Sequence, residues 1–127
     1  MSIHYTVSPP GIVINHIPAG PQTYIGSPSI AVLPDGSYVA THDVFGPGST
    51  YNTTRVFRSA DRGLTWEYLT TLEESFWGGL FCHRDTLYLM GCTARFGGMA
   101  IRKSVDGGRS WSRPTDENNG LLRADGM

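Results

Sequence analysis

Two adjacent residues, His42 and Asp43, are the first candidates for chemistry in this sequence. A carboxylate beside an imidazole can donate or accept a proton while a bond is broken, so the pair fits a catalytic general acid or base. Both residues follow a short β-rich run and precede a loop rich in Gly and Pro. The alternative is that Asp43 opens an Asx turn, in which its side chain bonds the backbone of that loop.

Four further residues in nearby loops fit the binding of a polar ligand. Tyr51 and Trp77 carry flat apolar rings that can stack on a sugar. Arg95 can hold a carboxylate or a sulfate with two parallel hydrogen bonds, and Glu74 adds an acidic group. The alternatives are packing inside the protein for the two aromatic residues and a solvated loop position for Arg95.

A repeat indicates which elements position these side chains. Residues 59–66 and 104–111 share the pattern Ser-x-Asp-x-Gly-x-(Ser/Thr)-Trp, and the two aspartates are 45 positions apart. Ser and Asp can bond backbone N–H groups of a tight turn, Gly permits a positive φ, and Trp carries apolar surface into the core. The repeat therefore predicts two structural hairpin turns, formed by Ser59, Asp61, Gly63, Thr65 and Trp66 and by Ser104, Asp106, Gly108, Ser110 and Trp111.

A period of this size is typical of a propeller blade, and the flanking sequence fits four antiparallel strands twice. The predicted strands are 29–33, 37–41, 54–58 and 66–70, followed by 79–82, 86–90, 99–103 and 111–112. We therefore predict an all-β fold made of propeller blades. Its parts are an N-terminal segment at 1–23 with an extra or closing strand over 11–17, a first blade at 24–72, a second blade at 73–115, and the start of a truncated third blade at 116–127.

Propeller geometry separates two ends of each blade. The octapeptide turns lie at one end. The loops that carry Asp43, Tyr51, Trp77 and Arg95 lie at the other, where propellers usually bind ligands. Asp61 and Asp106 are therefore not catalytic candidates.

Composition narrows the partners. The 127 residues have a formal net charge of −1 and no basic run, which argues against nucleic acid and anionic membranes as partners. The His and Cys residues lack ligand spacing, so neither a metal nor another cofactor is predicted. No signal peptide is recognisable, and the sequence does not decide the cellular compartment. We expect a cytoplasmic protein as the sequence stands, and a secreted or periplasmic one if a signal was removed.

The octapeptide resembles the Asp box, or BNR repeat, of sialidases (neuraminidases) and of other propeller families. Residues 24–43 are similar to the opening blade of sialidases, and Asp43 falls close to where that family places its acid/base aspartate. The arginine that begins the family's carboxylate-binding triad has no counterpart at residues 25–27. The resemblance implies about two blades of a six-bladed propeller related to exo-glycosidases, with a carbohydrate substrate that can be an acidic glycan.

The resemblance also implies that the chain alone lacks a complete active site, because the family's tyrosine nucleophile, its glutamate partner and the remaining arginines belong to later blades. Three copies of two blades would close a six-bladed ring, so a homotrimer is the favoured assembly, with a longer chain as the alternative. Two other functions stay open. One is a non-catalytic carbohydrate- or protein-binding module that self-associates, and the other is a remnant that folds only by self-association.

Overall fold

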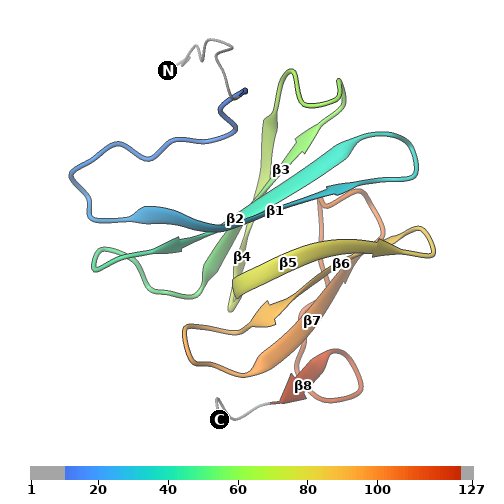
Figure 1. The fold of residues 1–127 in the computed structure, drawn as a ribbon. Coiled ribbons are helices and arrows are strands. Elements are labelled where there is room, and N and C mark those ends of the chain that lie inside the picture. Colours follow the sequence, from blue (N-terminus) through green and yellow to red (C-terminus); the bar gives the residue numbers. More distant parts are fainter. Residues whose placement is uncertain (1–10, 124–127) are drawn as a thin grey trace.

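The computed structural model describes residues 11–123, which form two four-stranded antiparallel sheets with the strands of each in chain order (Figure 1). The first sheet contains β1 (Tyr24–Val32), β2 (Tyr38–Phe45), β3 (Thr53–Ser59) and β4 (Glu67–Glu73). The second contains β5 (Phe76–His83), β6 (Thr86–Cys92), β7 (Met99–Ser104) and β8 (Leu121–Arg123). Over 11–123 no helix has the length and hydropathy needed to cross a membrane.

The core lies between the two sheets. Along β1 the side chains alternate, so that Ala31 is buried whereas Ile30 and Val32 are 55% and 60% exposed. The buried side chains form one cluster across both sheets, with partly buried neighbours packed against it: Ala31, Leu33, Val39, Val56 and Leu87, with Leu69, Leu72, Leu80 and Trp111. Each sheet thus covers one face of the other, and within residues 11–123 its opposite face, called the open face below, keeps exposed apolar side chains such as Ile30.

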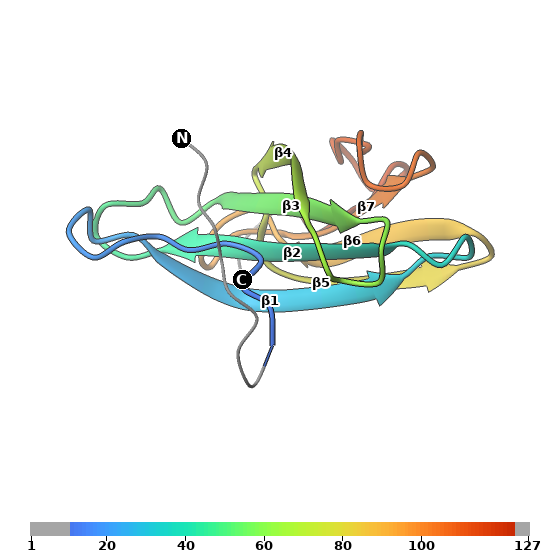
Figure 2. The same cartoon turned by 90° about the horizontal axis from the view of Figure 1, so that it is seen from above.

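The connections between strands gather at two ends of the sheets (Figure 2). One end carries the β1–β2 and β5–β6 hairpins, and Asp35, Asp85 and Gly107 line a shared hollow there. At the other end, the backbone N–H of Arg95 donates to the carbonyl of Tyr51 at 2.9 Å. This bond joins the loop after β2 to the loop after β6, so the loops that carry the binding candidates lie together.

The two octapeptides fold into the same turn. In each, the first serine hydroxyl accepts the N–H of the glycine, at 2.7 Å in the first copy and 2.9 Å in the second. The Asp carboxylate accepts both the N–H and the hydroxyl of the Thr or Ser four residues later, at 2.5 to 2.9 Å. The Trp indole N–H donates to the glycine carbonyl at 3.0 and 2.8 Å. Gly63 and Gly108 have φ values of 87° and 93°, which side chains of L-residues rarely adopt.

Neither predicted end strand forms as expected. The strand predicted over residues 11–17 is absent, apart from an isolated bridge at Gly11, because this segment has no strand ladder to join within residues 11–123. It instead crosses the open face of the first sheet. Residues 1–10 of the predicted N-terminal segment lie outside the described part of the chain.

The outer strand predicted at residues 111–112 is interrupted. Ser112 donates its N–H to the carbonyl of Lys103 at 2.9 Å, and the chain then leaves the sheet. Pro114 has no N–H for a ladder, and the side chain of Asn119 accepts the N–H groups of Thr115 and Asp116 to form a turn. The chain returns as β8, so residues 121–123 complete the second sheet instead of starting a third blade. Residues 124–127 lie outside the described part.

Candidate functional site

The candidate acid–base pair is not formed. Strand β2 extends to Phe45, which places His42 and Asp43 inside the strand, where neighbouring side chains point to opposite faces. Both residues are buried, with 5% and 2% exposed. Because side chains alternate along a strand, the imidazole of His42 and the carboxylate of Asp43 lie on opposite faces of the sheet, although the two residues are adjacent in the sequence.

Asp43 faces the second sheet and holds the start of β5. Its Oδ2 accepts the backbone N–H of Trp77 at 2.9 Å. Gly26 of β1 leaves room for the carboxylate, because an added β-carbon there would lie 2.8 Å from Oδ1. A buried carboxylate with a backbone donor is suited to fixing a chain segment.

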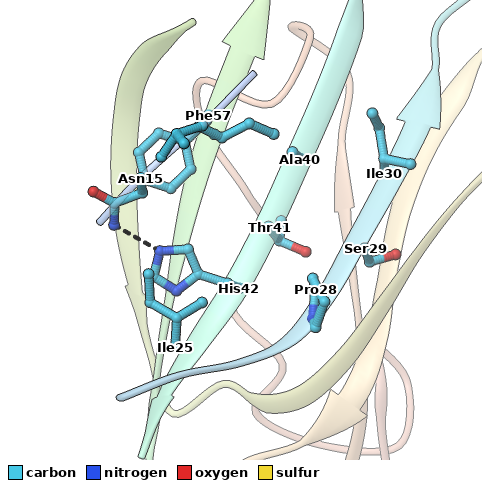
Figure 3. A pocket seen from close by; sticks show the side chains of 11 residues that line it. Asn15, Ile25, Pro28, Ser29, Ile30, Ala40, Thr41, His42 and Phe57 are labelled. Carbon is cyan, nitrogen blue, oxygen red and sulfur yellow. Dashed lines mark hydrogen bonds between the residues drawn. The ribbon is translucent and has the colours of Figure 1, made fainter. Parts of the chain in front are cut away.

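His42 faces the open side of the first sheet, where it lines a cavity of about 410 Å³ with Ile25, Ile30 and Phe57 (Figure 3). The amide of Asn15 donates to Nε2 at 2.9 Å, and Nδ1 donates to the carbonyl of Asp43 at 2.9 Å. Burial lowers the pKa of His42. The histidine is therefore a packed neutral residue, and the mainly apolar cavity offers few hydrogen bonds to a sugar.

Three of the four predicted binding residues are brought together. The guanidinium of Arg95 lies 4.0 Å from the centre of the Tyr51 ring and 5.5 Å from that of Phe96. Phe76 joins them, with its ring centre 6.2 Å from that of Tyr51 and 5.2 Å from that of Trp77. The rings of Trp77 and Phe96 are 5.5 Å apart. These five residues are called the aromatic–arginine cluster below.

The backbone of the cluster is in an unusual conformation. Tyr51, Trp77 and Phe96 have φ values of 56°, 52° and 60°, in the left-handed region that bulky residues avoid. Such strain is commonest at binding and catalytic sites. Trp77 lies in an irregularity of the β5–β6 pairing, and Ser27 occupies the matching irregularity of β1 with φ 46°. Irregularities of this kind re-aim a side chain.

The loop that carries Arg95 is held by its own hydrogen bonds. Thr93 donates its N–H to Gly98 O at 2.8 Å and accepts the N–H of Gly98 on its hydroxyl at 3.0 Å. The salt bridges found in residues 11–123 join Arg58 to Asp35 and Arg113 to Glu74. In that part of the chain, the charge of Arg95 is therefore not neutralised by a carboxylate.

Glu74, the fourth predicted binding residue, is not part of the aromatic–arginine cluster and contacts two other arginines instead. Its carboxylate pairs with Arg113 at 2.6 Å, and its carbonyl accepts a hydrogen bond from Arg102 at 2.8 Å. Arg102 also donates to the carbonyls of Glu73 at 2.7 Å and Ser112 at 3.2 Å. It is 7% exposed, and desolvation lowers its pKa.

Sequence reasoning missed two residues of this region, Phe76 and Arg102. The signal for Arg102 was the alternation of β7, in which Ala100, Arg102 and Ser104 share the buried face. Phe76 directly precedes the candidate Trp77, but the strand predicted at 79–82 began too late to include either residue. Among the described residues, no group of three or more His, Cys, Asp and Glu side chains is placed to hold a metal ion.

No protein-family model and no curated protein matches the sequence. Solved structures do match. An α-L-arabinanase from Penicillium chrysogenum, complexed with arabinobiose, gives a TM-score of 0.59 at 20% identity over 69% of this chain and 30% of that chain. An α-L-arabinofuranosidase from Fusarium graminearum, with an iminosugar inhibitor, gives 0.57 at 17% identity over 72% and 30%.

The chain has the fold of a partial β-propeller. Its two four-stranded sheets are consistent with propeller blades, and their first strands, β1 and β5, contact each other. The chain spans about 30% of the length of these two matched proteins. At such identities the similarity concerns the fold. It is a propeller fold of the kind found in glycoside hydrolases, and these two matches are an arabinanase and an arabinofuranosidase, not sialidases.

Proposed function

We propose that this chain is part of a glycoside-hydrolase-related propeller and that its aromatic–arginine cluster binds carbohydrate. The cluster carries the proposal, because it combines exposed aromatic rings with an unneutralised arginine at the loop end of both blades. Trp77 is 45% exposed and Phe96 is 70% exposed, so their rings can stack on sugars. The propeller fold of known glycosidases supports the same conclusion.

The cluster favours a glycan that carries an anionic group. Arg95 already rests on Tyr51, which limits the conformational freedom it would lose on binding a ligand. Its guanidinium edge suits a carboxylate held by two hydrogen bonds. The octapeptides and residues 24–43 support a sialidase-like origin of the chain, whereas the names of the structural neighbours make arabinose-containing glycans the neutral alternative.

Within the chain alone, the proposed role is binding without cleavage. Asp43 is the carboxylate expected from the sialidase resemblance, but it is buried and bonded to Trp77. We assign it a positioning role, in which it holds Trp77 in its left-handed conformation. Cleavage by a full-length relative would draw on blades beyond this chain.

The test is glycan binding by calorimetric titration of the full chain with oligogalacturonate, which is acidic, and arabino-oligosaccharide, which is neutral. Trp77→Ala is expected to weaken binding of either sugar at least tenfold, about 1.4 kcal/mol. Arg95→Gln is expected to weaken the acidic sugar alone. Arg84→Gln is the matched control, because Arg84 is an exposed arginine at the opposite end of the blade. No binding of either sugar, or equal loss in the control, contradicts the proposal.

Self-association is the second part of the proposal, and the open sheet faces favour it. Exposed apolar residues lie on both faces, including Ile30 on the first sheet and Met90 on the second. Three copies in a ring is the favoured assembly, and further blades of a longer chain are the alternative. A non-catalytic binding module that self-associates fits the same observations.

A further inference from the structure

Each blade leaves an apolar strip on the inner strands of its open face. On the first blade the strip is formed by Ile30 and Val32, which are 55% and 60% exposed. On the second it is formed by Phe81 and Met90, which are 41% and 42% exposed. Part of each open face is covered by the chain itself, by residues 13–15 on the first blade and 118–120 on the second. Within residues 11–123, the four side chains of the strips stay 41% to 60% exposed beside this cover.

The packing between the two blades of this chain shows what such faces accept. The blades correspond strand by strand, because the irregularities at Ser27 and Trp77, the β1–β2 and β5–β6 hairpins and the two octapeptides recur in the same order. The side chains that the first blade contributes to the shared core are Ala31, Val39 and Val56. At the corresponding positions the open face of the second blade carries Phe81, Tyr88 and Ile101.

The same correspondence holds in the other direction. The second blade contributes Leu80, Leu87 and Leu89 to the side that meets the first blade. At the corresponding positions the open face of the first blade carries Ile30, Tyr38 and Ala40. The open face of the second blade therefore repeats the apolar pattern of the first blade's surface in the junction. The open face of the first blade repeats the pattern of the second blade's surface.

We propose that the open face of the second blade packs head to tail on the open face of the first blade of another copy of this chain. Such a junction continues the packing already present inside the chain. Because the two surfaces differ, it repeats from copy to copy until the ring closes. The inference deepens the self-association proposed above, and it is independent of carbohydrate binding.

The cavity beside His42 supplies room for this contact. Its volume of about 410 Å³ lies between Val13, Ile14 and the strip residue Ile30, and its lining is mainly apolar. A large apolar side chain from the second blade of another copy, such as Met90 or Phe81, would fill part of it. Filling an apolar hollow with an apolar side chain removes surface from water on both copies.

The experiment measures mass by light scattering on a sizing column. The wild-type chain is expected to elute with the mass of three copies. Ile30→Asp and Met90→Asp each place a charge in one strip, so each variant alone is expected to elute as a monomer. An equimolar mixture of the two variants still has one pair of intact faces, so it is expected to give the mass of two chains.

Three results would overturn the proposal. They are a wild-type monomer at all concentrations, either face variant keeping the wild-type mass, and a mixture that stays monomeric. Val105→Asp is the control, because Val105 is 80% exposed on an octapeptide turn and lies outside both strips. Circular dichroism checks that each variant is folded, and Val32→Asn and Phe81→Asn replace any variant that is not. Glycan titration of the monomeric variants separates failure of the junction from failure of the binding site.

Discussion

At the scale of single residues, the most informative one is Asp43, because it connects the first blade to Trp77 of the aromatic–arginine cluster. Its carboxylate accepts the N–H of Trp77, and hydrogen bonds to charged groups contribute about 1.5–3 kcal/mol. Asp43→Asn preserves size and removes the charge. We expect a loss of stability of about 1–2 kcal/mol and weaker glycan binding, with a smaller effect on binding than Trp77→Ala. Urea unfolding and titration check both, and unchanged binding would contradict the positioning role.

Arg102 allows a second prediction at the same scale. Its guanidinium donates to three backbone carbonyls between β4 and the segment after β7. Arg102→Met would leave buried carbonyls without donors, so we expect a loss of about 3 kcal/mol in the free energy of unfolding. Arg113→Met is the matched control. The exposed pair of Arg113 with Glu74 contributes about 0–1 kcal/mol, so a similar loss in both variants would contradict this account.

At the scale of elements, the octapeptide turns make stability depend on acid. Hydrogen bonds from the hydroxyl and the N–H of Thr65 lower the pKa of Asp61 from 3.8 to about 2. Desolvation acts to raise the pKa of Asp106, but hydrogen bonds from Ser110 and Ser104 lower it to about 2. A carboxyl with a lower pKa in the folded state stabilises the fold above pH 3.8, and this contribution is lost as the pH falls toward 2.

We therefore expect the urea midpoint to fall between pH 4 and pH 2. Asp61→Asn and Asp106→Asn are each expected to lower the midpoint at pH 6 and to flatten its decline in acid. Glu67→Gln is the control, because Glu67 is an exposed strand residue. A wild-type midpoint that does not change from pH 4 to pH 2 would contradict the assignment.

The sequence was sufficient for both octapeptide turns and seven strands, and insufficient for the outer strand of the second blade. The two octapeptides and the paired runs around them predicted seven of the strands, although with shorter bounds. The strand β8 follows a turn centred on Asp116 and Asn119 that has no copy in the first blade. Pro114 and the Asn-Gly pair at 119–120 were the available signals for that turn.

The candidate site was predicted in part for a similar reason. Tyr51 and Arg95 lie in loops and Trp77 lies at the start of β5, all at one end of the blades, and the order of strands was enough to bring them together. The pairing of His42 with Asp43 failed, because the bounds of β2 decide whether adjacent residues lie in a strand or a loop. Those bounds depend on pairing with β1 and β3, which residue types alone do not fix.

At the scale of the whole molecule, head-to-tail association predicts that thermal stability depends on concentration. Subunits that bind only in the folded state raise the unfolding midpoint by mass action. We expect Tm of the wild-type chain to rise with protein concentration, and Tm of Ile30→Asp to be constant. Differential scanning calorimetry over a hundredfold range of concentration checks this. A concentration-independent Tm for the wild-type chain would contradict association linked to folding.

The strand order within each sheet has a consequence for how the protein is made. In the first sheet each strand pairs with the strand that precedes or follows it in the chain, so only a short connection has to close for each pair to form. Chains are synthesised from the N-terminus at roughly 5–20 residues per second, slowly compared with the formation of a hairpin. The first blade can thus assemble on the ribosome before β5 has emerged, and its buried face would then serve as the template on which the second blade folds.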